Sequence, residues 1–197
     1  TKNPITAAGG ICSLDEIVEL AKDNISCQLG MCIYTGKVKL EDAFCAILDF
    51  EKQGGLIPTI VQDRSTHQVL MLAYSTAESL KKSFETGLAT YYSRSRQALW
   101  TKGETSGNTQ ELLNAKFDCD RDSILFSVNQ KGNACHLGRY SCFEDKSFTF
   151  EELFNLILDR KEKLPENSYT TKLFNNDFYL KRKIMEEAFE TVNFEQG

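Results

Sequence analysis

Two apolar runs on either side of a short polar turn constrain the fold more than any other feature of this 197-residue sequence. The runs are IPTIVQ at 57–62 and VLMLAY at 69–74, and DRSTHQ lies between them. Runs of this length that are bounded by turn residues predict a β-hairpin. ATYYSR, ALWTKG and SILFSVNQ predict three more strands, so the stretch from 55 to 143 is expected to be rich in strands.

Helical patterns flank the strand-rich stretch. SLDE at 13–16 has the spacing of a capping box, in which side chains and amides at the start of a helix satisfy one another. A strand–helix–strand–helix pattern is predicted before residue 48. On the other side, Thr149 and Glu152 predict another capped helix, and a last helix is predicted from about 177 to 192.

One more helix is predicted inside the strand-rich stretch, from STAESLKKSFETG. Its expected cap is Ser75 with Glu78, and Gly87 is expected to end it. Strands and helices mixed in this way predict an α+β fold, with a strand-rich core, flanking helices and a short helical segment after it.

Charge and composition exclude two classes of partner. The formal net charge is -5, whereas phosphate backbones require a basic surface, so no nucleic acid is expected. No apolar run approaches the roughly 20 residues of a membrane span, and no signal peptide is present, so no membrane is expected. Seven cysteines, an odd number, indicate a reduced compartment, and a cytoplasmic location is expected. Four of them are expected to pack in the core: Cys12, Cys27, Cys32 and Cys45.

The other three cysteines, Cys119, Cys135 and Cys142, are candidate metal ligands. Three thiolates can hold zinc and leave its fourth position to water, which is the arrangement of a catalytic site. Such a water ionises near neutral pH and supplies a hydroxide nucleophile. Paired zinc ligands usually arrive as CxxC, so buried thiols without metal are the alternative.

Aspartates alternate with other residues in DCDRD at 118–122. In an extended segment Asp118, Asp120 and Asp122 project to one side, where three like charges repel unless a cation lies among them. Carboxylate oxygens suit magnesium, which keeps several waters and binds substrate phosphates. A solvated acidic turn is the alternative.

His136, one of only two histidines, follows Cys135 directly. A group that titrates near pH 6.5 beside a metal ligand is a candidate for taking a proton from the attacking water. An ordinary surface histidine is the alternative, and it is the expected reading of His67.

The segment YYSRSRQALWTKGETSGNTQ at 91–110 combines cations with glycines. Glycines let backbone amides approach an oxyanion, and arginine suits phosphate geometry. No P-loop motif is present, and a hairpin turn with polar decoration is the alternative. The candidates for phosphate binding are Arg94, Arg96, Lys102, Gly103, Ser106 and Gly107.

Six motifs follow one another over about residues 50–143: GGLIPTIVQD, VLMLAY, YYSRSR, LWTKGETSGN, DCDRD and ACHLGRYSCF. In this order they resemble phosphoribosyl-AMP cyclohydrolase of histidine biosynthesis. The resemblance implies hydrolytic opening of the purine ring of phosphoribosyl-AMP. It also implies zinc held by the three cysteines across a homodimer interface, and magnesium held by the three aspartates.

The chemistry of the implied reaction suggests roles for the remaining candidates. Magnesium and the cationic segment are expected to hold phosphate groups and fix the ring over the zinc, and His136 is the candidate for managing the proton of the attacking water. Tyr140 stands where many relatives have a second arginine, so phosphate contacts from its loop are left open. The motif LWTKGETSGN adds three substrate-binding candidates: Trp100, Glu104 and Thr105.

Both ends of the chain resemble other enzymes of the pathway. LPENSYTTKLF and KIMEEAFETV resemble the start of phosphoribosyl-ATP pyrophosphohydrolase, and ITAAGGICSLDEI with GMCIYTGKVKLEDA resembles the last β/α units of the barrel isomerase. The expected domains are a remnant at 1–48, the cyclohydrolase at 49–146 and a partial pyrophosphohydrolase-like helical segment at 147–197. The sequence begins at Thr1, and a piece of a longer multifunctional enzyme is expected.

Neither end is expected to be active by itself. Glu186, Glu187 and Glu190 have helical spacing and could share a magnesium ion, although such a face is usually only solvated. The pyrophosphohydrolase family needs a second acidic helix further downstream, so no pyrophosphohydrolase activity is expected. The barrel needs eight β/α units, and about two are visible here.

The leading hypothesis is a homodimeric cyclohydrolase that depends on zinc and magnesium. An inactive module stabilised by zinc is the second hypothesis, but a structural zinc site needs only the thiols, not KGETSGN, the aspartates and His136. A pyrophosphohydrolase acting from the EEAFE helix is the third, and the missing downstream acids disfavour it. Nucleic-acid binding is the weakest because of the charge.

Overall fold

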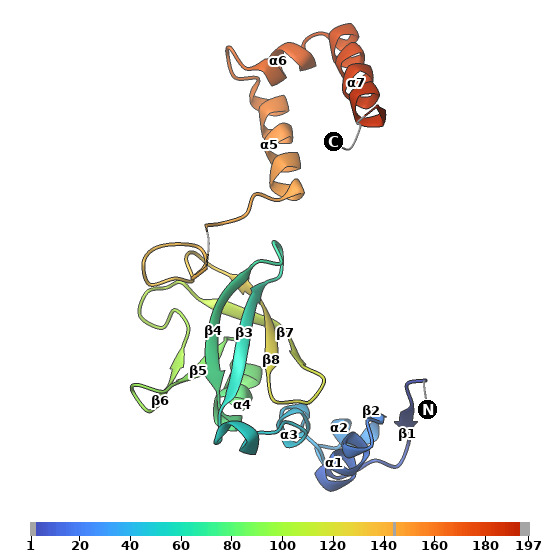
Figure 1. The fold of residues 1–197 in the computed structure, drawn as a ribbon, viewed down its shortest axis with the longest axis vertical. Helices are drawn as coiled ribbons and strands as arrows, with labels where there is room; N and C mark the ends of the chain where they lie inside the picture. The colour runs from blue at the N-terminus through green and yellow to red at the C-terminus, as the bar shows by residue number, and fades with distance from the viewer. Residues whose placement is uncertain (1–2, 144, 194–197) are drawn as a thin grey trace. The chain divides into compact units, whose positions relative to one another are not determined.

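The computed structural model describes residues 3–143 and 145–193 and divides the chain into two compact units, 1–146 and 147–197 (Figure 1). Strands and helices are mixed in the first unit, and the second is helical. The predicted α+β class is therefore confirmed.

A four-stranded sheet in the order β4–β3–β8–β7 forms the centre of the first unit. β3 (Ile57–Asp63) and β4 (Val69–Ser75) pair in antiparallel fashion, as the predicted hairpin requires. β8 (Ile124–Gln130) lies parallel to β3, and β7 (Gln110–Phe117) lies antiparallel to β8. The sequence did not predict β7. Most of its side chains are exposed or half-buried, so it lacks the apolar run by which a strand is recognised.

Three elements connect β4 to β7: α4 (Ala77–Thr86), β5 (Thr90–Ser93) and β6 (Ala98–Thr101). β5 and β6 pair in antiparallel fashion, as predicted. The helix is capped by Thr76 with Ser79, so the predicted cap at Ser75 and Glu78 is wrong by one residue. Ser75 is fully buried at the end of β4, where its hydroxyl lies 2.6 Å from that of Thr59 and is not available to a helix end.

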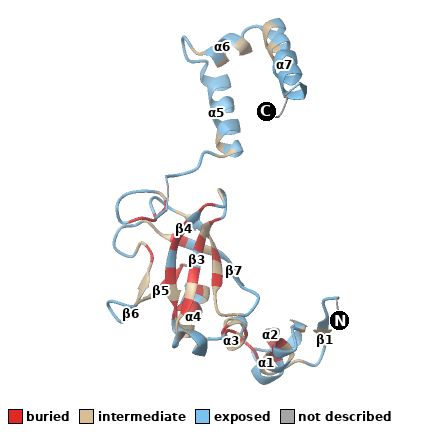
Figure 2. Cartoon of the chain, viewed as in Figure 1, coloured by how far each residue is buried: buried red, intermediate tan, exposed pale blue. Residues whose placement is uncertain are grey.

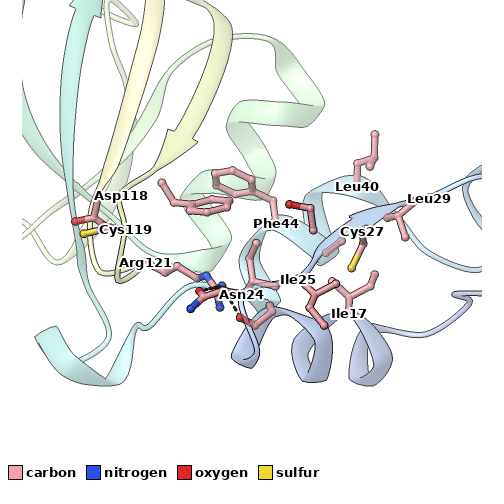
Figure 3. A pocket seen from close by; sticks show the side chains of 15 residues that line it. Ile17, Asn24, Ile25, Cys27, Leu29, Leu40, Phe44, Asp118, Cys119 and Arg121 are labelled. Atoms are coloured by element: carbon pink, nitrogen blue, oxygen red, sulfur yellow. Dashed lines mark hydrogen bonds between the residues drawn. The ribbon is translucent and has the colours of Figure 1, made fainter. Parts of the chain in front are cut away.

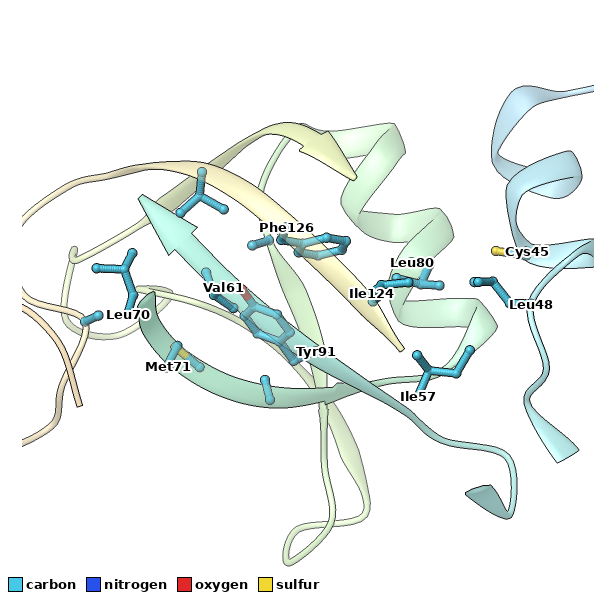
Figure 4. Close-up of a cluster of buried hydrophobic side chains, with 14 residues drawn as sticks. Cys45, Leu48, Ile57, Val61, Leu70, Met71, Leu80, Tyr91, Ile124 and Phe126 are labelled. Carbon is cyan, nitrogen blue, oxygen red and sulfur yellow. The ribbon is translucent and has the colours of Figure 1, made fainter. Parts of the chain in front are cut away.

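The main core lies between the sheet and α4 (Figure 4). Tyr91 and Phe126 are its largest fully buried side chains, and Leu80 comes from the helix. The buried hydroxyl of Tyr91 donates a hydrogen bond to Gln110 Oε1 at 2.7 Å, so the core contains this polar group without leaving it unpaired. The sheet and the loops that follow its strands therefore rest on a packed layer.

The amino-terminal part of the first unit begins with two parallel strands, β1 (Thr6–Ala8) and β2 (Ser26–Gln28). The predicted capping box of Ser13 and Glu16 is present. The helical elements here are α1 (Leu14–Lys22), α2 (Met31–Tyr34), α3 (Leu40–Ala46) and the 3-10 helix η1 (Glu51–Gln53).

The helix α3 contributes to two hydrophobic clusters. Its Ala43 packs with Ile17, Cys32 and Val38 in a small cluster, whereas its Cys45 belongs to the main core. Cys32 and Cys45 are buried, as predicted, and Cys27 is half-buried. The prediction that Cys12 packs in the core is wrong. Cys12 is exposed, because it directly precedes the cap of α1, where its amide donates to Glu16 Oε2 at 2.8 Å.

The second unit contains α5 (Phe150–Lys163), α6 (Tyr169–Phe174) and α7 (Asp177–Val192). The predicted cap of Thr149 with Glu152 and the predicted last helix are present, whereas α6 was not predicted. No residue of these three helices is buried (Figure 2). Throughout the described residues, no helix combines the length and the apolarity that a membrane span requires.

Candidate active site and metal ligands

The Cys loop, defined as residues 131–143, follows β8 and carries two of the three candidate thiols. It folds back on itself, because the amide of Cys135 donates to the carbonyl of Arg139 at 3.1 Å. Its far end is fixed to β4, where the amide of Cys142 donates to the carbonyl of Leu70 at 2.7 Å. These bonds place Cys135 and Cys142 beside the packed sheet.

The neighbouring glycine loop, residues 102–108, contains the KGETSGN motif. Gly103 has a φ of +84°, and a side chain there would come within 2.5 Å of the backbone of Asn108. The amide of Lys131 donates to the carbonyl of Thr109 at 2.9 Å, so this loop is tied to the Cys loop. Only a residue without Cβ permits the close turn at Gly103.

The two loops enclose a cavity of about 530 Å³. Both thiols of the Cys loop line it together with His136, and Lys102 and Ser106 reach it from the glycine loop. Trp100 of β6 forms another part of the wall. Six residues that were candidates for substrate binding, proton transfer or metal binding therefore surround the same cavity.

The electrostatics of this cavity couple the two thiols. The amide of Leu137, 3.5 Å from the sulfur, lowers the pKa of Cys135, and Cys142 and Arg139 lower it further. Burial raises the pKa of Cys142, and the charge of Cys135 raises it again. Burial lowers the pKa of Lys102, while the charges of both thiols oppose that change. Because the charge of Cys135 disfavours a charge on Cys142, the pair is a fitting environment for a cation.

Other predicted substrate residues lie around the cavity rather than in its wall. The guanidinium of Arg94 stacks 3.9 Å from the ring centre of Tyr74, and that of Arg96 lies 5.9 Å from the ring centre of Trp100. Among the described residues, the lining of this cavity does not include Arg94, Arg96, Gly103, Glu104, Thr105 or Gly107. Glu104 instead accepts a hydrogen bond from the amide of Thr101 at 3.1 Å.

The acidic turn, residues 118–122, connects β7 to β8 as a bend. The expectation of an extended segment is therefore wrong, but the carboxylates of Asp118, Asp120 and Asp122 still gather, with oxygens within 4.8 Å of one another. The bend forms because Asp118 Oδ1 accepts the amides of Asp122 and Ser123 at 3.1 and 3.2 Å. Partial burial raises the pKa of Asp118, but bonds from Ser123 and Asp122 outweigh it and lower the pKa.

Cys119 does not meet the other two thiols within one chain. In the described residues, the acidic turn is the one group of three or more histidine, cysteine or carboxylate side chains whose ligand atoms lie within 4.8 Å. Cys119 is exposed and lines a different cavity, of about 510 Å³, beside α1 and α3 (Figure 3). Asp118, Arg121 and Phe44 also line that cavity.

Several residues of the site were not singled out from the sequence. Asn108, Asn133 and Met71 line the cavity of the Cys loop, and Lys52 pairs with the acidic turn. Asn108 lies within LWTKGETSGN and Asn133 directly precedes ACHLGRYSCF, whereas Lys52 stands 68 positions before Asp120 and carried no signal. Tyr140 donates a hydrogen bond to the buried carboxylate of Asp63.

The glutamates of the second unit are paired with a cation of their own helix. Lys183 Nζ lies 2.8 Å from Glu186 Oε1 and 2.9 Å from Glu187 Oε1. All three side chains lie on the surface of α7, since no residue of that helix is buried. The arrangement is that of a solvated helix face with ion pairs three and four residues apart.

Comparison with known proteins gives two family matches. Residues 71–144 match the model of phosphoribosyl-AMP cyclohydrolase, and residues 150–194 match that of phosphoribosyl-ATP pyrophosphohydrolase. The first match includes the acidic turn, the glycine loop and the whole Cys loop. The second lies within the helical unit.

Similar proteins are named as bifunctional proteins of histidine biosynthesis. The histidine biosynthesis bifunctional protein HisIE of Bacillus subtilis is 47% identical over 151 residues, which is 71% of this chain and 72% of the relative. The protein of the same name from Lactococcus lactis is 49% identical over 152 residues, 73% of this chain and 71% of the relative. That of Escherichia coli O157:H7 is 44% identical over 149 residues, 74% and 73% of the two chains.

The predicted resemblance is thus confirmed by both family models and by relatives that share close to half of the aligned residues. The chain belongs to the family of bifunctional histidine biosynthesis proteins, and it is a hydrolase of the phosphoribosyl-AMP cyclohydrolase type followed by a pyrophosphohydrolase-like segment.

Proposed function

We propose that the first unit opens the purine ring of phosphoribosyl-AMP in the cavity of the Cys loop, with zinc held by Cys119, Cys135 and Cys142. The substrate follows from the family, whose members depend on metal. The observation that carries the proposal is the meeting of two thiols, His136 and Lys102 around one cavity. Cys119 completes the set from the second chain of a homodimer.

The donor set fits zinc. Cys135 and Cys142 are close enough for the charge of one to shift the pKa of the other, and a divalent cation relieves that repulsion. When bound by three thiolates, zinc supplies the Lewis acidity that lowers the pKa of water toward neutrality. A structural site would need the thiols but not the histidine and lysine beside them.

The chain's own residues bind the substrate and manage its protons. Water adds to the ring carbon between two nitrogens, and the C–N bond breaks as the ring nitrogen gains a proton. His136, exposed at the cavity, accepts the proton of the water and returns it to that nitrogen. Trp100 offers an aromatic face to the adenine, and Lys102, which is 8% exposed, offers a desolvated cation to phosphate oxygens.

Magnesium is proposed at the acidic turn, on Asp118, Asp120 and Asp122. Oxygens opposite one another around magnesium are about 4 Å apart, and the three carboxylates lie within 4.8 Å before any ion draws them in. The ammonium of Lys52 already contacts two of them, so the cluster accepts a positive charge. When bound, magnesium supplies further charge for the substrate phosphates.

Heterodimers of two cysteine variants test the shared zinc site. Cys119→Ala and Cys135→Ala chains with different affinity tags are co-expressed, and the mixed dimer is purified through both tags. We expect about half of the wild-type activity and one zinc per dimer, because one of the two sites keeps all its ligands. Each variant alone should have neither zinc nor activity.

The matched control pairs Cys135→Ala with Cys142→Ala. These two thiols line the same cavity of one chain, so the mixed dimer breaks both sites and should be inactive. Zinc content and cyclohydrolase turnover are measured on the wild type, the three single variants and the two mixed dimers. A Cys119→Ala/Cys135→Ala dimer without activity would contradict sharing between chains, and zinc-free active protein would contradict the zinc proposal itself.

The second unit carries a separate proposal. The family match over 150–194 supports a relationship to pyrophosphohydrolase, and the ion pairs of Lys183 occupy two of the three glutamates. We infer that residues 147–197 by themselves do not hydrolyse phosphoribosyl-ATP, since within the described residues of this unit no three acidic side chains bring their oxygens together and Lys183 pairs with Glu186 and Glu187. Offering phosphoribosyl-ATP to the protein and measuring pyrophosphate release tests this inference.

A further inference from the structure

Lys52 reaches the acidic turn from a separate element. It belongs to η1, just before β3, and its Nζ lies 2.6 Å from Asp120 Oδ2 and 2.5 Å from Asp122 Oδ2. Both ion pairs join side chains that are neighbours in space but far apart in sequence. The acidic turn therefore already holds a cation that the chain itself provides.

The backbone fixes where this cation is delivered. The amide of Lys52 donates to Asp49 Oδ1 at 3.1 Å, and the amide of Asp49 donates to the carbonyl of Arg121 at 2.8 Å. η1 is thereby tied to the middle of the acidic turn by contacts that do not involve the ammonium. The side chain of Lys52 can leave the carboxylates while its backbone remains in place.

The three aspartates differ in what already satisfies them. Both carboxylate oxygens of Asp118 accept hydrogen bonds from neighbours in the chain. Oδ1 accepts the amides of Asp122 and Ser123, and Oδ2 accepts the hydroxyl of Ser123 at 2.6 Å. Asp120 and Asp122 instead have the ammonium of Lys52 as their ion-pair partner. One positive charge faces three negative ones, so the cluster keeps an excess of negative charge that a divalent cation would neutralise.

We propose that the ammonium of Lys52 and the divalent cation compete for Asp120 and Asp122, so that Lys52 holds the two carboxylates together before the metal binds and sets the metal concentration at which the site fills. The proposal rests on the magnesium site proposed above. Two cations on the same oxygens repel one another, so metal binding displaces the ammonium. The side chain of Lys52 is 46% exposed, so water can solvate the ammonium group after the metal displaces it.

Titration with manganese(II) as the probe tests this competition on the intact protein. Electron paramagnetic resonance counts free Mn²⁺ for the wild type and for Lys52→Met. We expect Lys52→Met to bind Mn²⁺ about threefold to tenfold more tightly, because two partly exposed ion pairs no longer oppose binding. Asp122→Asn should lose most of the binding, which locates the signal at the acidic turn.

Lys81→Met is the matched control. Lys81 also forms a partly exposed ion pair, with Asp42 Oδ1 at 2.6 Å, but that pair joins α3 to α4. Its removal should leave Mn²⁺ affinity unchanged. A second readout follows the wild type alone: Mn²⁺ should speed the acetylation of Lys52 by acetic anhydride, measured by mass spectrometry, and should leave that of Lys81 unchanged.

The outcomes distinguish a failure of the competition by Lys52 from a failure of the magnesium site on which it rests. Equal Mn²⁺ affinity of the wild type and Lys52→Met, or slower acetylation of Lys52 with Mn²⁺, overturns the competition while the metal site stands. If neither protein binds Mn²⁺ at the acidic turn, the magnesium proposal fails and the competition fails with it. The role of Lys52 is supported if Lys52→Met binds Mn²⁺ more tightly while Lys81→Met does not, and if Mn²⁺ speeds the acetylation of Lys52 in the wild type.

Discussion

His136 lies exposed at the cavity that Cys135 and Cys142 line, so its imidazole is accessible to water as well as to substrate. We expect His136→Asn to lower kcat about 10²-fold to 10⁴-fold, because a positioned general base contributes on that order. Zinc content should hold, since the histidine is not one of the proposed ligands. Turnover under saturating substrate and zinc per chain are the two measurements.

His67→Asn is the control for this change, because it is the other histidine of the chain and is also exposed. Its φ of +57° is one that asparagine tolerates, so the hairpin turn should keep its form. Activity should stay at the wild-type value. An unchanged kcat in His136→Asn would remove the residue from the mechanism.

At this scale the sequence indicates ligand types but not their partners. Thiols and carboxylates restrict which metals a site accepts, so Cys135 and Asp120 were candidates before any fold was known. Lys52 was not, because a lysine is ordinary on any surface and only η1 brings it to the acidic turn. Contacts between distant positions depend on the fold, and a single sequence does not show them.

Among the elements, the glycine loop has a conformation that depends on a missing side chain. A Cβ at Gly103 would lie 2.5 Å from the backbone of Asn108, and its φ of +84° is strained for any other residue. We expect Gly103→Ala to distort the loop, to displace Lys102 from the cavity wall and to raise KM for phosphoribosyl-AMP about tenfold or more. Steady-state kinetics and a thermal melt measure the two effects.

Gly107→Ala separates the clash from the strain. Gly107 also has a positive φ, +74°, but a Cβ there meets nothing within 4 Å. This variant should lose only about 1 kcal/mol of stability from backbone strain and should keep a KM near that of the wild type. Equal KM values for the two alanine variants would argue against a packed glycine loop.

Elements were predictable where pattern and chemistry agreed. The β3–β4 hairpin follows from its two apolar runs, and α5 from the cap of Thr149. β7 and α6 were missed because the exposed side of a sheet and a six-residue helix have little periodicity. The cap of α4 moved by one residue because burial of Ser75 in the sheet outweighed its preference for a helix end.

For the whole molecule, a zinc site shared between chains should link metal binding to assembly. Removing zinc with a chelator should shift the protein toward monomer at low concentration, since a ligand that binds only the dimer stabilises it. Sedimentation velocity with and without chelator measures the shift. Re-addition of zinc should restore both dimer and activity.

The Cys119→Ala variant supplies the control for this experiment. It lacks one proposed ligand, so its dimer should already be weaker and should respond little to chelator. Cys12→Ala, at an exposed thiol far along the chain from the site, should behave as the wild type does. If the wild type sediments identically with and without chelator, the proposal that zinc joins the two chains would be contradicted.

The arrangement of the whole chain was the least predictable level. The parallel pairing of β3 with β8 joins strands more than sixty positions apart, and no local pattern encodes it. The separation of Cys119 from the Cys loop depends on the fold as well, because the acidic turn precedes β8 and the Cys loop follows it, at the opposite end of the strand. The strand and helix patterns predicted the class of fold, but strand order determines where each ligand lies.

The position of α3 in both clusters has a consequence for protein engineering. Cys45 and the nearby Leu48 belong to the main core, while Ala43 belongs to the small cluster of the first helices. A fragment trimmed to begin at Asp49 would therefore expose buried hydrophobic surface and aggregate more readily than the full unit. Heating should melt the amino-terminal helices and the sheet in a single cooperative transition, because one rigid helix transmits the loss of either cluster to the other.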